Sequence, residues 1–285
     1  MRTENVTSIK RPIFIVSSPR SGSSLLFQTL AQSPDVVTIG GESHNLIESV
    51  PGLHPRFRSW ESNRLVAADA TKATVHHLAQ RFQQFLRDRN GHGAVANAVM
   101  IEKTPKNSLR VPFFAAAFPD ARFLFLYRDS RETVASMMEA WTSGRFQTYP
   151  RLPDWPGIAW SLLLVPGWRD LRGLPLPEIV ADQWARTMEI LVDDLSSLPS
   201  HRVCAISHSD FIQKPQCTIE AICAALELNW DRTLPSTLPL SPTVVSAPAT
   251  DKWRQREDII QAIWPLLEKA DGKARQALAA FQVKN

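Results

Sequence analysis

The sequence predicts an α/β fold: a P-loop-like central parallel sheet of about five strands flanked by helices. First, short β-branched apolar runs alternate with stretches of helical periodicity, as in parallel strands joined by crossover helices. Second, a loop of small residues, Ser17–Ser24, stands directly between the first apolar run and the first helix. We expect strands at 12–17, 36–39, 99–102, 122–127 and 202–207, and later helices at about 71–89, 107–117, 130–140, 181–198 and 215–226.

The composition is that of an ordinary globular protein, with 44% hydrophobic and 21% charged residues among 285. We expect one domain spanning 1–285, with enough chain to bury a core. The net charge of +4 is small and dispersed, which argues against nucleic acid and favours a compact anionic ligand. The oligomeric state cannot be inferred from these features.

The cysteines and the lengths of the apolar segments indicate the cellular compartment. The three cysteines, Cys204, Cys217 and Cys223, show no CxxC spacing, which favours a reducing compartment. No apolar run approaches the ~20 residues of a membrane-spanning helix, and the first residues lack a signal-peptide core. We therefore expect a cytoplasmic protein. No histidine or cysteine pattern has metal-ligand spacing, so we expect no metal site.

Two segments depart from the α/β pattern. Residues 141–180 are dense in Pro, Trp and Gly, which is typical of a functional lid or a partly helical insertion. The segment supplies Leu162–Val165 and many aromatic residues, which either form an apolar wall for a substrate or pack the insertion onto the core. The aromatic residues of this first segment are Trp141, Phe146, Tyr149, Trp155, Trp160 and Trp168. In the second segment, residues 255–282 are expected to form one or two helices, broken at Pro265 and near Gly272.

The small-residue loop is a candidate anion site. At a helix N-terminus after a strand, backbone N–H groups are unpaired and the helix dipole is positive, so a phosphate or sulfonate can bind there. Arg20 adds a fixed positive charge; the simpler alternative is a serine N-cap. The loop lacks the Walker A residues, because Ser17 stands where a glycine, and Ser23 where the lysine, would be required.

A second candidate anion site follows the strand at 122–127. Arg128 stands at the carboxyl edge of that strand, and Ser136 lies about two turns along the next helix. Ligands of open parallel sheets bind at such edges, so two neighbouring anion sites suggest a nucleotide with phosphate at its 5′ and 3′ positions. The alternatives are an ion pair of Arg128 with Asp129 or Glu132 and a simple packing role for Ser136.

These motifs resemble those of the sulfotransferases that use 3′-phosphoadenosine 5′-phosphosulfate (PAPS). The resemblance covers nearly the whole chain. Pro19–Ser24 (PRSGSS) is similar to their 5′-phosphosulfate loop, in the arginine form of protein-tyrosine and bacterial members. Arg128 and Ser136 stand at the spacing of their 3′-phosphate motif. Supporting similarities are GESHNL at Gly41–Leu46, EKTPKN at Glu102–Asn107 and DKWR at Asp251–Arg254.

The resemblance implies a role for each of these residues. Glu42 is the implied general base, with His44 as the reserve candidate, and each could instead be an ordinary loop side chain. Arg20 and Lys103 would stabilise the transferring sulfuryl group, although Lys103 could be only a surface lysine before a turn. The residues implied to bind the nucleotide are Arg20, Ser21, Gly22, Ser23, Ser24, Arg128, Ser136, Ser207, Lys252, Trp253 and Arg254.

The sequence therefore predicts a sulfotransferase that moves a sulfuryl group, without a metal, from PAPS to a hydroxyl of a small or lipid-like acceptor. A hydrophobic natural-product alcohol would suit the aromatic segment, and 3′,5′-adenosine bisphosphate (PAP) would be the other product. Two alternatives stay open. One is a metal-dependent P-loop kinase of small molecules, and the other is a non-catalytic nucleotide-binding module that acts through partners.

Overall fold

The computed structural model describes residues 9–93, 97–240, 245 and 251–283. Within them, five parallel strands form one sheet in the order β2-β3-β1-β4-β7, and β5 pairs with β6 in an antiparallel hairpin. The strands are β1 (Ile13–Val16), β2 (Val36–Val37), β3 (Val99–Lys103), β4 (Arg122–Tyr127), β5 (Gln147–Tyr149), β6 (Trp160–Ser161) and β7 (Val203–Ser207). The helices are α1 (Ser23–Leu30), α2 (His44–Glu48), α3 (Lys72–Phe85), α4 (Val111–Ala117), α5 (Ser130–Thr142), α6 (Leu176–Ser196), α7 (His208–Gln213), α8 (Pro215–Leu226) and α9 (Glu257–Phe281).

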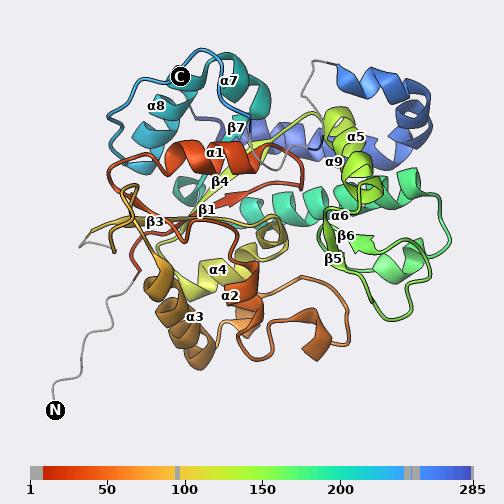
Figure 1. The fold of residues 1–285 in the computed structure, drawn as a ribbon, viewed down its shortest axis with the longest axis horizontal. Coiled ribbons are helices and arrows are strands. Elements are labelled where there is room, and N and C mark those ends of the chain that lie inside the picture. Colours follow the sequence, from red (N-terminus) through yellow and green to blue (C-terminus); the bar gives the residue numbers. More distant parts are fainter. Residues whose placement is uncertain (1–8, 94–96, 241–244, 246–250, 284–285) are drawn as a thin grey trace.

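Helices cover both faces of the sheet (Figure 1). Because successive strand residues point to opposite faces, Ile13 and Ile15 of β1 pack toward α1, α7 and α8, in one hydrophobic cluster. Phe14 and Val16 point the other way, into a larger cluster with α4, α6 and α9. This two-sided burial explains why the strands are apolar at nearly every position. The predicted α/β class with a five-stranded parallel sheet is confirmed.

Most predicted boundaries lie close to those observed, and the differences have local causes. The strand expected at 36–39 ends at Val37, because Thr38 bridges to Arg87 in an antiparallel direction instead. The helix expected at 107–117 is divided into the 3-10 turn η3 (Pro105–Leu109) and α4. Pro112 lacks an N–H and its ring crowds the preceding turn, which favours a new helix start, and it lies in the first turn of α4, where no N–H is needed.

The expected break in the C-terminal helix is wrong. Residues 257–281 form the single helix α9, with Pro265 inside it. A stripe of small and apolar residues on α9, including Ile263, Leu267 and Ala274, is buried against the core, where α9 packs along α6. Pro265 lies on the exposed face, where the carbonyl group that loses its helical hydrogen bond can meet water. Tertiary packing thus overrides the local signal.

The segment 141–180 is organised rather than irregular. It contains the end of α5, the β5–β6 hairpin, the 3-10 turn η4 (Trp168–Leu171) and the start of α6, which begins at Leu176 and not at 181. Its buried apolar residues belong to the same hydrophobic cluster as α4, α6 and α9, whereas Ile158 and Leu174 are exposed.

Two further observations concern cysteines and membrane spans. Cys204 and Cys223 are buried, Cys217 is exposed, and all three are free. Among the residues that the structure describes, no helix combines the length and the apolar character needed to cross a membrane.

Candidate active site

The loop between β1 and α1 is held in a fixed shape at the carboxyl edge of the sheet. Ser17 N–H donates to Ser108 Oγ at 3.1 Å, and that hydroxyl donates back to the Ser17 carbonyl at 2.5 Å. The chain then passes through left-handed backbone at Arg20 (φ 68°) and Gly22 (φ 88°) before α1 begins. Gly22 is the N-cap and has no side chain to bond the first N–H groups of α1, so these are left for a ligand.

His208 packs directly on this loop, which the sequence analysis missed. A Cβ atom on Gly22 would lie 2.5 Å from Cδ2 of His208, so the site requires glycine for space as well as for its φ angle. Burial, with a smaller effect of Arg128, lowers the pKa of His208 to about 3, so the ring is neutral at pH 7. The signal for it was its position directly after the last strand of the sheet.

The two predicted anion sites are contiguous, and Arg20 joins them. Arg128 donates from Nη1 to the carbonyl of Arg20 at 3.1 Å and from Nε to Glu132 at 3.0 Å. Arg20 donates from Nε to Ser136 Oγ at 3.3 Å, and its guanidinium lies 4.7 Å from the ring centre of Phe146, directly before β5. The ion pair that was the simpler alternative for Arg128 does exist, yet Arg128 still lines the cavity.

Glu42 and Lys103 form an ion pair beside the loop. Lys103 Nζ lies 2.6 Å from Glu42 Oε1 and donates to Ser24 Oγ at 2.9 Å. His44 Nδ1 is 3.7 Å from the other Glu42 oxygen. Burial alone would raise the pKa of Glu42, but His44 and the charge of Lys103 outweigh it and lower that pKa to about 2. In the free protein, Glu42 is a stable carboxylate.

A second carboxylate, Glu102, fixes the turn that carries Glu42. It is fully buried and accepts hydrogen bonds from Ser43 Oγ and Thr104 Oγ1, each at 2.5 Å, and from Asn107 Nδ2. Burial raises its pKa. The Thr104 hydroxyl also accepts from the Ser43 backbone N–H at 2.8 Å. This network joins the turn after β3 to the loop before α2 and so sets the position of Glu42.

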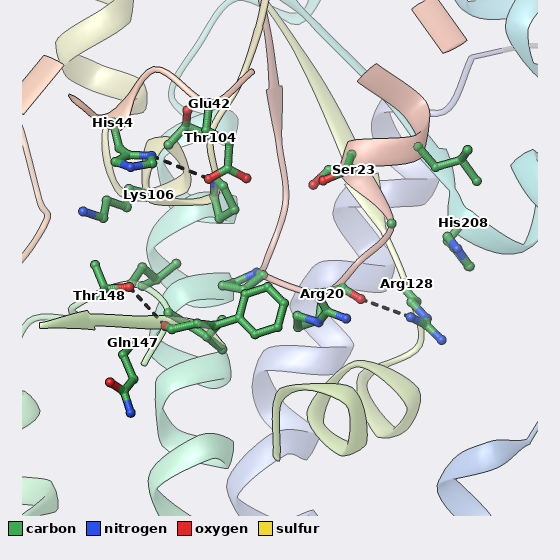
Figure 2. A pocket seen from close by; sticks show the side chains of 18 of the residues that line it. Arg20, Ser23, Glu42, His44, Thr104, Lys106, Arg128, Gln147, Thr148 and His208 are labelled. Carbon is green, nitrogen blue, oxygen red and sulfur yellow. Dashed lines mark hydrogen bonds and ion pairs between the residues drawn. The ribbon is translucent and has the colours of Figure 1, made fainter. Parts of the chain in front are cut away.

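Arg20, Glu42, His44, Arg128 and His208 line one cavity of about 970 Å³. In Figure 2, Arg128 and His208 lie at one end, Glu42, His44 and Lys106 at the other, and Arg20 and Ser23 between them. The volume is at the upper end of the range for ligand sites.

Six predicted nucleotide-binding residues do not line this cavity: Ser21, Ser136, Ser207, Lys252, Trp253 and Arg254. Ser207 is the N-cap of α7, where it accepts from the Asp210 N–H at 3.0 Å and donates to its carboxylate at 2.7 Å. Lys252 pairs with Glu139 at 2.8 Å. Trp253 is buried, with the guanidinium groups of Arg131 and Arg254 stacked over its ring.

The aromatic segment contributes to the cavity, but its tryptophans do not. The lining residues from this segment are Phe146, Gln147, Thr148, Tyr149, Leu162 and Leu163. Trp160 and Trp168 are fully buried, and Trp141 donates from Nε1 to Gln183 of α6 at 3.0 Å. Of the two interpretations left open by the sequence, packing onto the core describes the tryptophans.

Comparison with known proteins decides the family. A family model described as the sulfotransferase family matches residues 12–162. The chain belongs to the sulfotransferase family. The predicted family is thereby confirmed, and with it the prediction that the protein is a transferase.

Two curated relatives of this sulfotransferase are named as protein-tyrosine sulfotransferases. Protein-tyrosine sulfotransferase A of Caenorhabditis elegans is 22% identical over 223 residues, which cover 77% of this chain and 50% of that protein. Protein-tyrosine sulfotransferase 1 of Danio rerio is 33% identical over 128 residues, covering 44% and 35%. The chain thus spans half or less of the length of these relatives.

Solved structures agree on the fold. A sulfotransferase from Alicyclobacillus acidocaldarius superposes with a TM-score of 0.52 at 14% identity, covering 95% of this chain and 96% of that one. A mouse sulfotransferase solved in complex with PAP gives a TM-score of 0.52 at 11% identity, covering 95% and 88%. At such low identities the likeness concerns the fold alone.

Proposed function

We propose that this sulfotransferase transfers a sulfuryl group from PAPS to a hydroxyl of a small or lipid-like acceptor that fits the space beside Glu42. The observation that carries the proposal is one cavity lined by the small-residue loop, by Arg20 and Arg128 and, beyond them, by Glu42, whose carboxylate is paired with the buried Lys103. A nucleotide bearing phosphates at both ends matches the first part. A hydroxyl that must lose a proton matches the second.

The residues of the loop suit the donor. The N–H groups at the start of α1 and the serine hydroxyls of Ser23 and Ser24 would bind the 5′-phosphosulfate. Arg128, with Ser136 beside Arg20, would bind the 3′-phosphate, as an arginine fork binds phosphate well. His208, neutral and packed on Gly22, adds a flat polar surface at the same end. The family membership supports the choice of PAPS.

In the proposed reaction, the acceptor oxygen attacks sulfur in line, and the bond from sulfur to the 5′-phosphate oxygen breaks. PAP leaves with that electron pair, and Glu42 accepts the hydroxyl proton. Arg20 and Lys103 stabilise the charge that develops on the transferring and leaving groups. His44, 3.7 Å from Glu42, is the alternative base.

Lys103 has to change partners for Glu42 to act as the base. A carboxylate with a pKa of about 2 is a weak base at neutral pH. Because Lys103 also contacts Ser24, an anion bound at the loop would attract its ammonium group away from Glu42. Donor binding would then raise the pKa of Glu42 at the moment the base is needed.

The acceptor side supports a small molecule with an apolar body, because Phe146, Leu162 and Leu163 form that wall. Lipid-like alcohols belong to the same proposal. A tyrosine in a protein is the second candidate, and the names of the curated relatives favour it. A reducing compartment, the cytoplasm, is also part of the proposal and is supported by the three free thiols.

Calorimetry with PAP and 5′-AMP tests the donor site. We expect PAP to bind far more tightly, and Arg128→Ala to lower PAP affinity by ~2–4 kcal/mol while leaving 5′-AMP affinity almost unchanged. Arg151→Ala, which removes an exposed arginine, is the matched control. Equal affinity for the two nucleotides would contradict the 3′-phosphate assignment, and tighter binding of ATP with Mg²⁺ would favour the kinase alternative. Transfer of label from PAPS to a panel of phenols, alcohols and tyrosine peptides then tests the reaction.

A further inference from the structure

The end of the cavity away from Arg128 contains a cluster of charged side chains, which we call the basic corner: Glu48, His54, Arg56, Lys106 and Arg110. Lys106 Nζ donates to both Glu48 oxygens, at 2.8 and 2.9 Å. Arg110, which is completely buried and does not line the cavity, donates to Glu48 at 2.7 Å. Glu48, His54, Arg56 and Lys106 line the cavity itself, and Lys106 is seen beside His44 in Figure 2.

Positive charge exceeds negative charge in the basic corner. The cations Lys106 and Arg110 share one carboxylate, and Arg56 at the rim has no carboxylate partner within the described part of the chain. Burial, together with these three cations, lowers the pKa of His54 against the opposing effect of Glu48, so its ring is neutral. Two buried cations, Lys106 and Arg110, therefore share one carboxylate, and the exposed Arg56 adds a third positive charge at the rim. A partly buried excess of positive charge is unfavourable unless an anion completes it.

Hydrogen-bond donors in the corner also remain for a ligand. The hydroxyl oxygen of Tyr149 accepts from Asn63 at 2.5 Å and from Lys106 at 3.0 Å, so its own proton can be donated. Burial and the charge of Glu48 raise the pKa of Tyr149, which keeps the phenol protonated. His54 Nδ1 accepts the Arg56 backbone N–H at 2.9 Å, so in the neutral ring the proton is on Nε2. With the Arg56 guanidinium, these groups can bind both oxygens of a carboxylate.

We propose that the acceptor is a hydroxylated organic acid whose carboxylate binds in the basic corner while its hydroxyl reaches Glu42. This rests on the proposed function, because Glu42 must be where the hydroxyl reacts. Helix α2 separates the two points: Glu42 lies just before it and Glu48 is its last residue. Glu48 follows Glu42 by six residues, which at a helical rise of about 1.5 Å per residue corresponds to about 9 Å, roughly the span from a phenol hydroxyl across its ring to the carboxylate of a short side chain. Leu162 and Leu163 supply the apolar surface for that ring. Hydroxyaryl carboxylic acids are therefore the class that fits.

The test compares acids with their methyl esters, which keep the hydroxyl and the ring but lose the charge. Binding of 4-hydroxybenzoate, 4-hydroxyphenylacetate and 3-(4-hydroxyphenyl)propionate, and of each ester, to the protein–PAP complex is measured by calorimetry. Transfer of label from PAPS gives kcat and KM for the same compounds. We expect at least one acid to bind tenfold or more tightly than its ester, with the difference appearing in KM.

Variants at the exposed rim locate the effect without disturbing the buried network. Arg56→Gln should reduce the preference for the acid to threefold or less, Arg56→Lys should retain most of it, and Lys72→Gln on the exposed side of α3 should change nothing. If every ester binds as well as its acid while PAP still binds, the carboxylate subsite is wrong and the proposed function stands. An acid preference that survives in Arg56→Gln and in Lys106→Gln also overturns it. Failure of PAP to bind would instead contradict the proposed function.

Discussion

Glu42 shows how its neighbours decide what a residue can do. The sequence motif alone predicts a base, whereas the structure adds that His44 and the ion pair with Lys103 together hold the carboxylate in its charged form in the free protein. Lys103 is nearly buried and close to the anion loop, so it couples the base to the occupancy of that loop. The catalytic character of Glu42 thus depends on a neighbour 61 residues away in the chain.

The pH dependence of stability tests this ion pair. A folded-state pKa of about 2, below the ordinary value of 4.5, means that Glu42 stabilises the fold fully above pH 4.5. This contribution is lost as the pH falls from 4.5 to about 2. Glu42→Gln should therefore lower the free energy of unfolding at pH 7, and the difference from wild type should shrink across that window in urea titrations. A difference that stays constant down to pH 2 would contradict the pairing.

The same variant has a kinetic signature. Glu42→Gln should lower turnover by ~10²–10⁴-fold, the usual range for loss of a general base, while PAP affinity is retained. Near-normal turnover of Glu42→Gln, together with inactivity of His44→Ala, would assign the base to His44.

Gly22 and His208 form a second residue pair whose coupling can be measured. Gly22→Ala should destabilise the fold by ~1–3 kcal/mol, because alanine at φ 88° is strained and its Cβ meets the His208 ring at 2.5 Å. In a double-mutant cycle with His208→Ala, the steric part of this cost should disappear and the backbone part should remain, with a coupling energy of ~0.5–3 kcal/mol. Thermal unfolding of the wild type, the two single variants and the double variant measures this coupling energy. Full additivity would show that the ring does not limit the space at Gly22.

At the scale of elements, the segment 141–180 divides into an inner and a cavity-facing part. Trp160 packs edge-on against Trp141, Trp155 and Trp168, with ring centres 5.3, 4.8 and 5.8 Å away. Phe146, directly before β5, and Tyr149, its last residue, instead reach the cavity, and Phe146 contacts Arg20. The hairpin is therefore built on the core and presents one strand to the site.

A substitution in the tryptophan cluster distinguishes this arrangement from a mobile lid. Trp160→Ala should lower the free energy of unfolding by ~3–5 kcal/mol, because a fully buried ring is lost and the Leu163 carbonyl loses its hydrogen bond from Nε1. Ile158→Ala is the control, since that side chain is 53% exposed and should cost little. If Trp160→Ala left stability unchanged and affected only transfer to the acceptor, the segment would be a lid.

For the whole molecule, the sequence predicted what depends on neighbours along the chain. The apolar strands, the small-residue loop and Arg128 after β4 could be recognised because each is a local pattern, and the parallel topology then places them at one edge. The basic corner could not be predicted, because Glu48, Lys106 and Arg110 meet only through the packing of α2 against the turn after β3. The continuity of α9 through Pro265 likewise depends on its contact with α6.

The C-terminal helix also supports the nucleotide end of the site, and this connection can be tested. Asp271 of α9 is buried, accepts from Tyr127 Oη at 2.6 Å at the end of β4, and accepts from Arg275 at 2.7 Å. Arg275 in turn donates at 3.0 Å to Asp129, the N-cap of α5 directly after Arg128. These bonds join α9 to the strand end and helix start that position Arg128.

Asp271→Ala removes the shared acceptor and leaves a buried phenol hydroxyl without its partner. We expect the free energy of unfolding to fall by ~2–4 kcal/mol in urea titrations, because an unsatisfied buried donor and a broken charged hydrogen bond both cost stability. We also expect weaker PAP binding than in Glu268→Ala, which removes an exposed acid from the same helix and should stay within ~0.5 kcal/mol of wild type in stability. If Asp271→Ala matched Glu268→Ala in both measurements, α9 would be a neighbour of the nucleotide site and not its support.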